Sequence, residues 1–149
     1  MREVLVFLVD DSIADATLIK MVAKQSKLSN EIRHFEDGQS ALDHMNDPGK
    51  ELPDLMLLDL NMPGMSGHDV LERIRSTDRL RRLPVVVLTS SEDESDVARS
   101  YDEHVNAYVV KPIGVKGFQQ IVESIEQFWF TIVKLPPRPS QGVLPVLGG

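Results

Sequence analysis

Residues 55–59 read Leu-Met-Leu-Leu-Asp, four consecutive apolar residues that end on a carboxylate. The same pattern occurs at Val4–Val9, which Asp10 follows, and a third apolar run occupies Val85–Leu88. Strands that are apolar at every position are typical of parallel sheets covered by helices on both faces. We therefore expect buried parallel strands, at least two of which end in acidic side chains.

Two weaker strands and several helical patterns surround these runs. Ile32–Phe35 is a weaker run with Arg33 and His34 between apolar residues, which suits an edge strand, and Ala107–Val110 is the last strand expected. Apolar residues recur at helical spacing between the strands, so helices are expected at 12–27, 38–46, 66–76, 92–103 and from 115 onward. On the inner side of the first helix we expect Ile13, Leu18, Met21 and Val22.

The order of these elements predicts the fold class. Strands that alternate with helices predict an α/β protein with a doubly wound, five-stranded parallel sheet. We expect the strand order 2-1-3-4-5, which is the known order of flavodoxin-like proteins and is therefore not an independent result. The domain should occupy residues 3–133, followed by a Pro-rich, extended or disordered tail at 134–149.

Composition limits the partners and the location. The chain has 149 residues and a net charge of −7, which argues against sequence-independent binding to nucleic acid or to anionic membranes. It has no cysteine, so neither a disulfide nor a cysteine-based zinc site can form. No apolar stretch has the length of a membrane span or the flanking charges of a signal peptide. We expect a cytoplasmic protein.

The residues that follow the strands are the candidate site, because ligands of open parallel sheets bind beyond the carboxyl ends of the strands. Asp10 and Asp11 follow the first strand, and Asp59 follows the third. Crowded carboxylates favour a hard divalent cation, and Mg²⁺ fits oxygen ligands best. A carboxylate beside Mg²⁺ can attack a phosphoryl group and form an aspartyl-phosphate, whose charge Lys111 and the Thr89 hydroxyl can stabilise.

Several motifs in order resemble the receiver domain of two-component response regulators. They are Asp10-Asp11, LLDLNMPGMSG at 57–67, VLTS at 87–90 and YVVKP at 108–112. The resemblance covers residues 3–133 and implies a flavodoxin-like receiver fold. It also implies a response regulator that takes a phosphoryl group from a histidine kinase and switches protein–protein interactions. Such a protein assists its own phosphorylation and dephosphorylation but is not an enzyme in the usual sense.

The resemblance assigns the acidic residues. Asp59 would be the phosphoacceptor. Asp10, Asp11 and Asp59 would bind Mg²⁺, with the backbone carbonyl of Asn61 as a further ligand.

It also assigns the residues around the phosphoryl group. Lys111 would pair with the phosphoryl oxygens. Thr89 would move to bond the phosphoryl group while Tyr108 turns inward, which is a two-state switch. Asn61 and Ser91 occupy positions that tune hydrolysis of the phosphoryl group in the family.

The end of the chain bears on output and partners. No helix-turn-helix fits in residues 134–149, so we expect no DNA-binding output domain. Phe128-Trp129, Val133 and Leu135-Pro136 resemble the ending of small single-domain regulators paired with phytochrome-type histidine kinases, which implies such a photoreceptor as partner. The aromatic side of the last helix favours a homodimer through the last strand and helix.

Other functions have specific requirements. A phosphatase of the haloacid-dehalogenase type needs a second Asp two positions after the nucleophile, where this chain has Asn61. A flavodoxin-like electron carrier needs a phosphate cradle after the first strand, where Asp10 and Asp11 would repel phosphate. A receiver that dimerises constitutively and ignores phosphate is a third alternative.

Each residue also has a purely structural interpretation. An Asp pair after a strand can be a turn or a helix cap, and Tyr108 can be ordinary edge-strand packing. The acidic run at 92–96 is expected to be a solvated helix start. No role is assigned to the four histidines, which lie apart without metal-ligand spacing: His34, His44, His68 and His104.

Overall fold

The computed structural model describes residues 3–26 and 30–131, with the backbone alone at 128–131. Within these residues a five-stranded sheet has the order β2-β1-β3-β4-β5, and all its strand pairs are parallel. The strands are β1 (Val4–Val9), β2 (Asn30–Phe35), β3 (Leu55–Leu58), β4 (Val85–Thr89) and β5 (Ala107–Val110). The doubly wound sheet and its strand order are confirmed.

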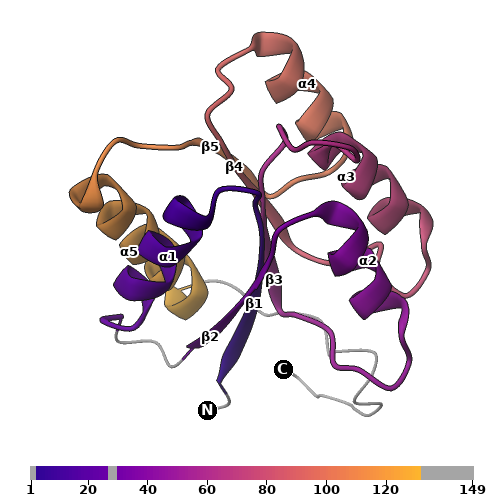
Figure 1. Ribbon diagram of the computed structural model, residues 1–149, viewed down its shortest axis with the longest axis horizontal. Helices are drawn as coiled ribbons and strands as arrows, with labels where there is room; N and C mark the ends of the chain where they lie inside the picture. The colour runs from indigo at the N-terminus through magenta and orange to yellow at the C-terminus, as the bar shows by residue number, and fades with distance from the viewer. Residues whose placement is uncertain (1–2, 27–29, 132–149) are drawn as a thin grey trace.

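Helices cover both faces of the sheet (Figure 1). On one face lie α1 (Ile13–Ala23) and α5 (Val115–Thr131). On the other lie α2 (Gly38–Asn46), α3 (Gly67–Ser76) and α4 (Glu94–Asp102). Each helix from α1 to α4 begins after a capping residue whose side chain accepts a backbone N–H. In chain order these caps are Ser12, Asp37, Ser66 and Asp93.

The apolar runs fill two cores, one on each face. Successive side chains of a strand point to opposite faces, so Leu5, Phe7 and Val9 pack toward α2 and α3. Val4, Val6 and Leu8 pack toward α1 and α5. Every residue of β1 is therefore buried, which explains why this strand is apolar throughout rather than at alternate positions.

The predicted inner face of α1 was partly wrong. Ile13 and Met21 are exposed, at 61% and 49%. The helix begins only after Ser12 and ends at Ala23, and its short buried stripe consists of Ala16, Ile19, Val22 and Ala23. Small alanines on this stripe let α1 approach the sheet, a feature that a search for large apolar residues overlooks.

Some expectations fall outside the described residues. They concern the tail at 134–149, the domain end at 133 and the motif residues Val133 and Leu135-Pro136, together with the side chains of Phe128 and Trp129. In the part of the chain that is described, no helix combines the length and apolarity needed to cross a membrane.

Candidate functional site

The carboxyl ends of β1, β3 and β5 bring the predicted site residues together. The backbone N–H of Asp59 donates to the Val9 carbonyl at 2.9 Å, and that of Lys111 donates to the Thr89 carbonyl at 2.7 Å, so sheet hydrogen bonding continues into the site. Carboxylate oxygens of Asp10, Asp11 and Asp59 all lie within 4.8 Å of one another. The predicted acidic cluster is therefore a feature of the fold.

The three carboxylates differ in burial. Asp10 is 0% exposed and Asp59 is 4% exposed, whereas Asp11 lies at the surface. Burial raises the pKa of Asp10 above its ordinary value, although the hydrogen bond from Lys111 opposes the shift. The inner part of the site is thus a costly place for negative charge, and a cation stabilises it.

Lys111 is the cation on the inner side. Its Nζ lies 2.8 Å from Asp10 Oδ2, 3.2 Å from Asp59 Oδ2 and 2.9 Å from Asp15 Oδ2. Burial alone would lower the pKa of Lys111, but the bonds to Asp10 and Asp15 outweigh it and hold the pKa above its ordinary value. The ammonium is therefore permanently charged at neutral pH.

Asp15 was not among the predicted site residues. It lies in the first turn of α1, three residues after the capping Ser12. The contact joins the first turn of α1 to the residue that follows β5, and nothing local in the sequence signals it.

Asp59 is held by donors from three directions. Thr89, which is fully buried, donates its hydroxyl to Asp59 Oδ1 at 2.7 Å. The backbone N–H of Asn61 donates to the same oxygen at 3.2 Å. Lys111 donates to Oδ2, so both oxygens of this carboxylate accept hydrogen bonds.

The loop after Asp59 is kept in place by the start of α3. A Cβ on Gly67 would lie 2.4 Å from the Asp59 carbonyl oxygen and 2.6 Å from Leu60 Cα, so only glycine fits there. Its N–H donates to the Leu60 carbonyl at 2.9 Å. Ser66 and Asp69 form a capping box at this helix start.

Ser91 and Tyr108 adjoin the same site. The Tyr108 hydroxyl donates to the Ser91 carbonyl at 2.9 Å, and the Ser91 N–H lies 3.5 Å from Thr89 Oγ1. Tyr108 therefore does more than pack against an edge strand.

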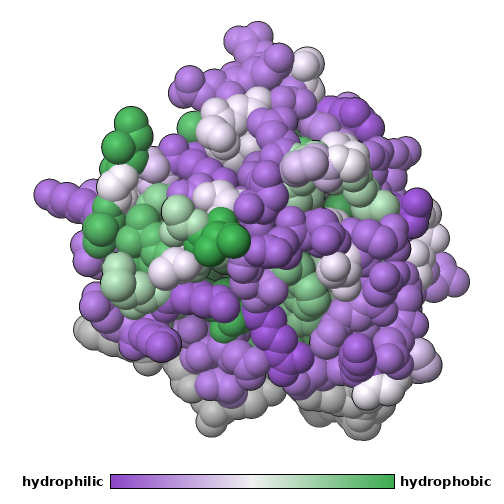
Figure 2. Space-filling model, in the orientation of Figure 1, coloured by the Kyte–Doolittle hydropathy of each residue, from purple (hydrophilic) through white to green (hydrophobic). Residues whose placement is uncertain are grey.

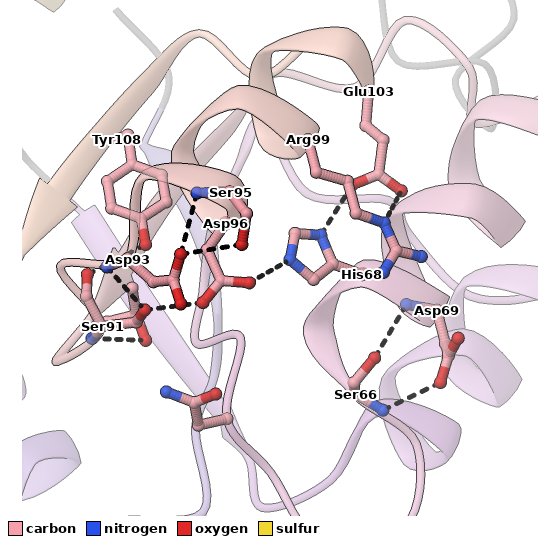
Figure 3. Close-up of polar contacts among 12 residues, drawn as sticks. Ser66, His68, Asp69, Ser91, Asp93, Ser95, Asp96, Arg99, Glu103 and Tyr108 are labelled. Atoms are coloured by element: carbon pink, nitrogen blue, oxygen red, sulfur yellow. Dashed lines mark hydrogen bonds and ion pairs between the residues drawn. The ribbon is translucent and has the colours of Figure 1, made fainter.

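His68 and Asp96, for which no functional role was predicted, form polar contacts that extend to Ser91. His68 is buried between Asp96 and Glu103, and its ring nitrogens lie 3.0 Å and 2.8 Å from their carboxylates (Figure 3). Asp96 belongs to the run predicted to be a solvated helix start, yet it is half-buried and also accepts from the Ser91 hydroxyl at 2.6 Å. The solvated interpretation was wrong for Asp96.

The donor set fits a hard divalent cation. Three carboxylates converge, one of them at the surface, and oxygen is the ligand that such cations prefer. Lys111 balances only part of their charge, which leaves net negative charge for a metal to neutralise.

Comparison with known proteins identifies the family. The response regulator receiver domain family matches residues 6–125. The chain belongs to this family. Response regulator Rcp1 of Synechocystis sp. is 41% identical to this receiver over 135 residues, which cover 88% of the chain and 92% of Rcp1. The probable methanogenesis regulatory protein FilR2 of Methanothrix harundinacea is 38% identical over 128 residues, covering 84% and 83% of the two chains.

Solved structures agree with the fold. The phosphorylated cyanobacterial phytochrome response regulator RcpA superposes with a TM-score of 0.83 at 39% identity, covering 91% of this receiver and 99% of RcpA. The Mn²⁺-bound form of Rcp1 superposes with a TM-score of 0.81 at 40% identity, covering 89% and 98%. The flavodoxin-like receiver fold and the likeness to phytochrome response regulators are thus confirmed.

Proposed function

We propose that this receiver accepts a phosphoryl group on Asp59 from the phosphohistidine of a histidine kinase, in a Mg²⁺-dependent reaction that switches its contacts with partner proteins. The observation that carries the proposal is the convergence of Lys111 and Thr89 on the Asp59 carboxylate. Both are groups that stabilise charge on transferred phosphoryl oxygens.

The transfer is a displacement at phosphorus. An Asp59 carboxylate oxygen forms the new P–O bond as the P–N bond to the kinase histidine breaks, and the electron pair leaves with the imidazole nitrogen. The Nζ of Lys111 lies 3.2 Å from Asp59 Oδ2, so after the transfer it can pair with the negatively charged phosphoryl oxygens. Thr89 is 2.7 Å away and can transfer its hydroxyl donation from Asp59 to the phosphoryl group.

Asp10, Asp11 and Asp59 are the residues that would hold Mg²⁺, with the backbone carbonyl of Asn61 as a further ligand. When bound, the metal neutralises negative charge on the acceptor and on the phosphoryl oxygens. The carboxylate cluster and the name of the Mn²⁺-bound form of Rcp1 support a divalent cation here.

The switch and the lifetime of the phosphoryl group depend on the next layer of residues. Thr89 would move to bond the phosphoryl group while Tyr108 turns inward, and in this structure the Tyr108 hydroxyl donates to the Ser91 carbonyl. Asn61, whose N–H donates to Asp59, and Ser91, whose N–H faces Thr89, would tune hydrolysis of the phosphoryl group. The chain would therefore act as a phosphoacceptor rather than as an enzyme with a separate substrate.

Exposed apolar side chains indicate the surface that would contact a partner protein. Val110 is 40%, Ile113 100% and Val115 45% exposed where β5 leads into α5. Figure 2 shows apolar side chains gathered over the side of the molecule where α1 and α5 lie. We assign the β5 and α5 surface to a homodimer, and a phytochrome-type histidine kinase to the donor role, which the name of RcpA supports.

Labelling tests the acceptor. A radiolabelled small phosphodonor with Mg²⁺ should give a base-sensitive label on the wild type and none on Asp59→Asn. Asp43→Asn removes an exposed carboxylate on α2 and serves as the matched control, with labelling unchanged. Label that persists on Asp59→Asn contradicts the assignment, and multiple turnover of a small phosphate ester favours the phosphatase alternative instead.

A further inference from the structure

The position of α4 depends mainly on polar contacts. Within α4, all of which is described, Ser100 is the only buried residue. Apolar burial is the main force that fixes a helix on a sheet, and α4 has little of it. Contacts from α4 to its neighbour α3 therefore have a large influence on where this helix lies.

His68, the second residue of α3, makes the central contact of this kind. Its Nε2 lies 3.0 Å from Asp96 Oδ1 and its Nδ1 lies 2.8 Å from Glu103 Oε1 (Figure 3). Its side chain is 8% exposed, and that of Glu103 is 13% exposed. A neutral imidazole has one N–H, whereas two carboxylate acceptors require two, so this geometry fits the imidazolium.

The contact continues to the phosphoacceptor. Asp96 uses its other oxygen to accept the Ser91 hydroxyl at 2.6 Å. Ser91 in turn holds the Tyr108 hydroxyl through its carbonyl and faces Thr89 through its N–H. His68 is thus connected through Asp96 and Ser91 to both residues of the proposed switch.

We propose that His68 is a proton-dependent latch, which as an imidazolium fastens α4 to α3 and stabilises the arrangement of Ser91 and Tyr108 that favours a phosphorylated Asp59. The proposal rests on the function proposed above. It makes His68 a positioning residue, since it touches neither Asp59 nor the phosphoryl group. It predicts that the affinity of the Asp59 site for a phosphoryl mimic depends on the protonation of His68 on α3.

Charged groups from α3 and from α4 with its C-terminal cap surround the His68 ring. Asp96 of α4 and Glu103, which caps the end of that helix, face the ring, and Arg99 lies 3.9 Å from the outer oxygen of Glu103. From α3, the Arg75 guanidinium donates to the backbone carbonyl of Glu103 at 3.0 Å.

Asp96 stays charged over the pH range of histidine titration. The Ser91 hydroxyl and then His68 hold the pKa of Asp96 below its ordinary value. Loss of the ring proton as pH rises would leave one carboxylate facing a nitrogen lone pair, which releases the latch.

Beryllofluoride, a mimic of the phosphoryl group, provides the test. Its affinity for the full chain with Mg²⁺ should be measured from pH 6 to about 8.5 for the wild type and for His68→Gln. We expect the wild type to bind at least about fivefold more tightly than His68→Gln at the acid end, with a ratio that falls toward one as pH rises. Taking the ratio cancels the pH dependence that metal and fluoride chemistry contribute to both proteins.

Two further variants sharpen the result. His104→Asn replaces an exposed histidine near α4 at a positive φ that asparagine tolerates, and its ratio to the wild type should stay constant with pH. Asp96→Asn should reproduce the effect of His68→Gln, and the double variant should be no weaker than either single one. These two variants also carry the test if His68→Gln does not fold.

The outcomes separate the two proposals. A wild-type to His68→Gln ratio that is flat across the pH range overturns the latch and leaves the phosphoacceptor intact. Additive effects of His68→Gln and Asp96→Asn also overturn it, because they exclude action through Asp96. Absence of Mg²⁺-dependent beryllofluoride binding by the wild type overturns both proposals together.

Discussion

The hydroxyl of Thr89 at the end of β4 donates a 2.7 Å hydrogen bond to the carboxylate of Asp59 at the end of β3. Both residues are buried. This bond places the proposed switch residue directly on the proposed phosphoacceptor. Removing the Thr89 hydroxyl should therefore lower the free energy of unfolding and, separately, impair the switch.

Thr89→Val keeps the shape of the side chain and removes the donor. Asp59 Oδ1 retains the Asn61 N–H, so we expect a loss of about 1 kcal/mol in the free energy of unfolding. Asp59 should still accept label, but the response of Tyr108 should be lost. Urea unfolding and the change in tyrosine absorbance on adding beryllofluoride measure the two effects. Thr17→Val, on the exposed side of α1, is the control, and a full tyrosine response in Thr89→Val would contradict the switch.

Lys111→Met removes the inner cation. Asp10 and Asp59 then remain buried without a positive partner, so we expect metal-free protein to lose about 3 kcal/mol of unfolding free energy. Saturating Mg²⁺ should recover part of the loss. Lys20→Met on exposed α1 surface is the control for loss of a lysine. A loss below about 1 kcal/mol in urea would show that Lys111 does not balance the cluster.

Mg²⁺ should stabilise the wild type against thermal unfolding. A ligand that binds only the folded state adds about 2.7 kcal/mol at a concentration of 100 Kd. Asp11 is the exposed member of the cluster, so Asp11→Asn should fold normally and lose most of this gain. Calorimetry with Mg²⁺ and with a chelator measures it. An equal gain in Asp11→Asn would remove Asp11 from the ligand set, while Asp43→Asn should behave as the wild type.

Asp96 makes a contribution to acid stability. Its pKa lies below the ordinary value, chiefly because the Ser91 hydroxyl donates to it, so its charged form is favoured in the folded state. Asp96 therefore adds stability above its ordinary pKa, and this contribution disappears as pH falls through the lowered pKa. Asp96→Asn should be less stable than the wild type at pH 7, with the difference shrinking in acid. Urea midpoints against pH test this, and a constant difference would refute it.

The sequence was sufficient for the sheet and for the centre of the site. Parallel strands that are buried on both faces are apolar throughout, and their carboxyl ends meet at one edge of the sheet. The sequence alone therefore predicts that the residues after these strands form one cluster. Asp10, Asp11 and Asp59 lie together for this reason.

The rest depends on where the helices lie. Asp15 of α1 meets Lys111 after β5, and His68 of α3 meets Asp96 of α4, through contacts between elements that are far apart in the sequence. Periodicity predicts that a helix has an inner side but gives its rotation poorly when that side is made of alanines. The wrong placement of Ile13 and Met21 has this cause.

Reductive trapping of the phosphorylated protein tests the central claim most directly. Borohydride converts an aspartyl-phosphate to homoserine, and peptide mass spectrometry then locates the modified position after incubation with a phosphodonor and Mg²⁺. We predict homoserine at position 59 and an unmodified chain when Mg²⁺ is chelated. Homoserine at position 10 or 11 instead, or at no position, would contradict the assignment of Asp59 as the phosphoacceptor.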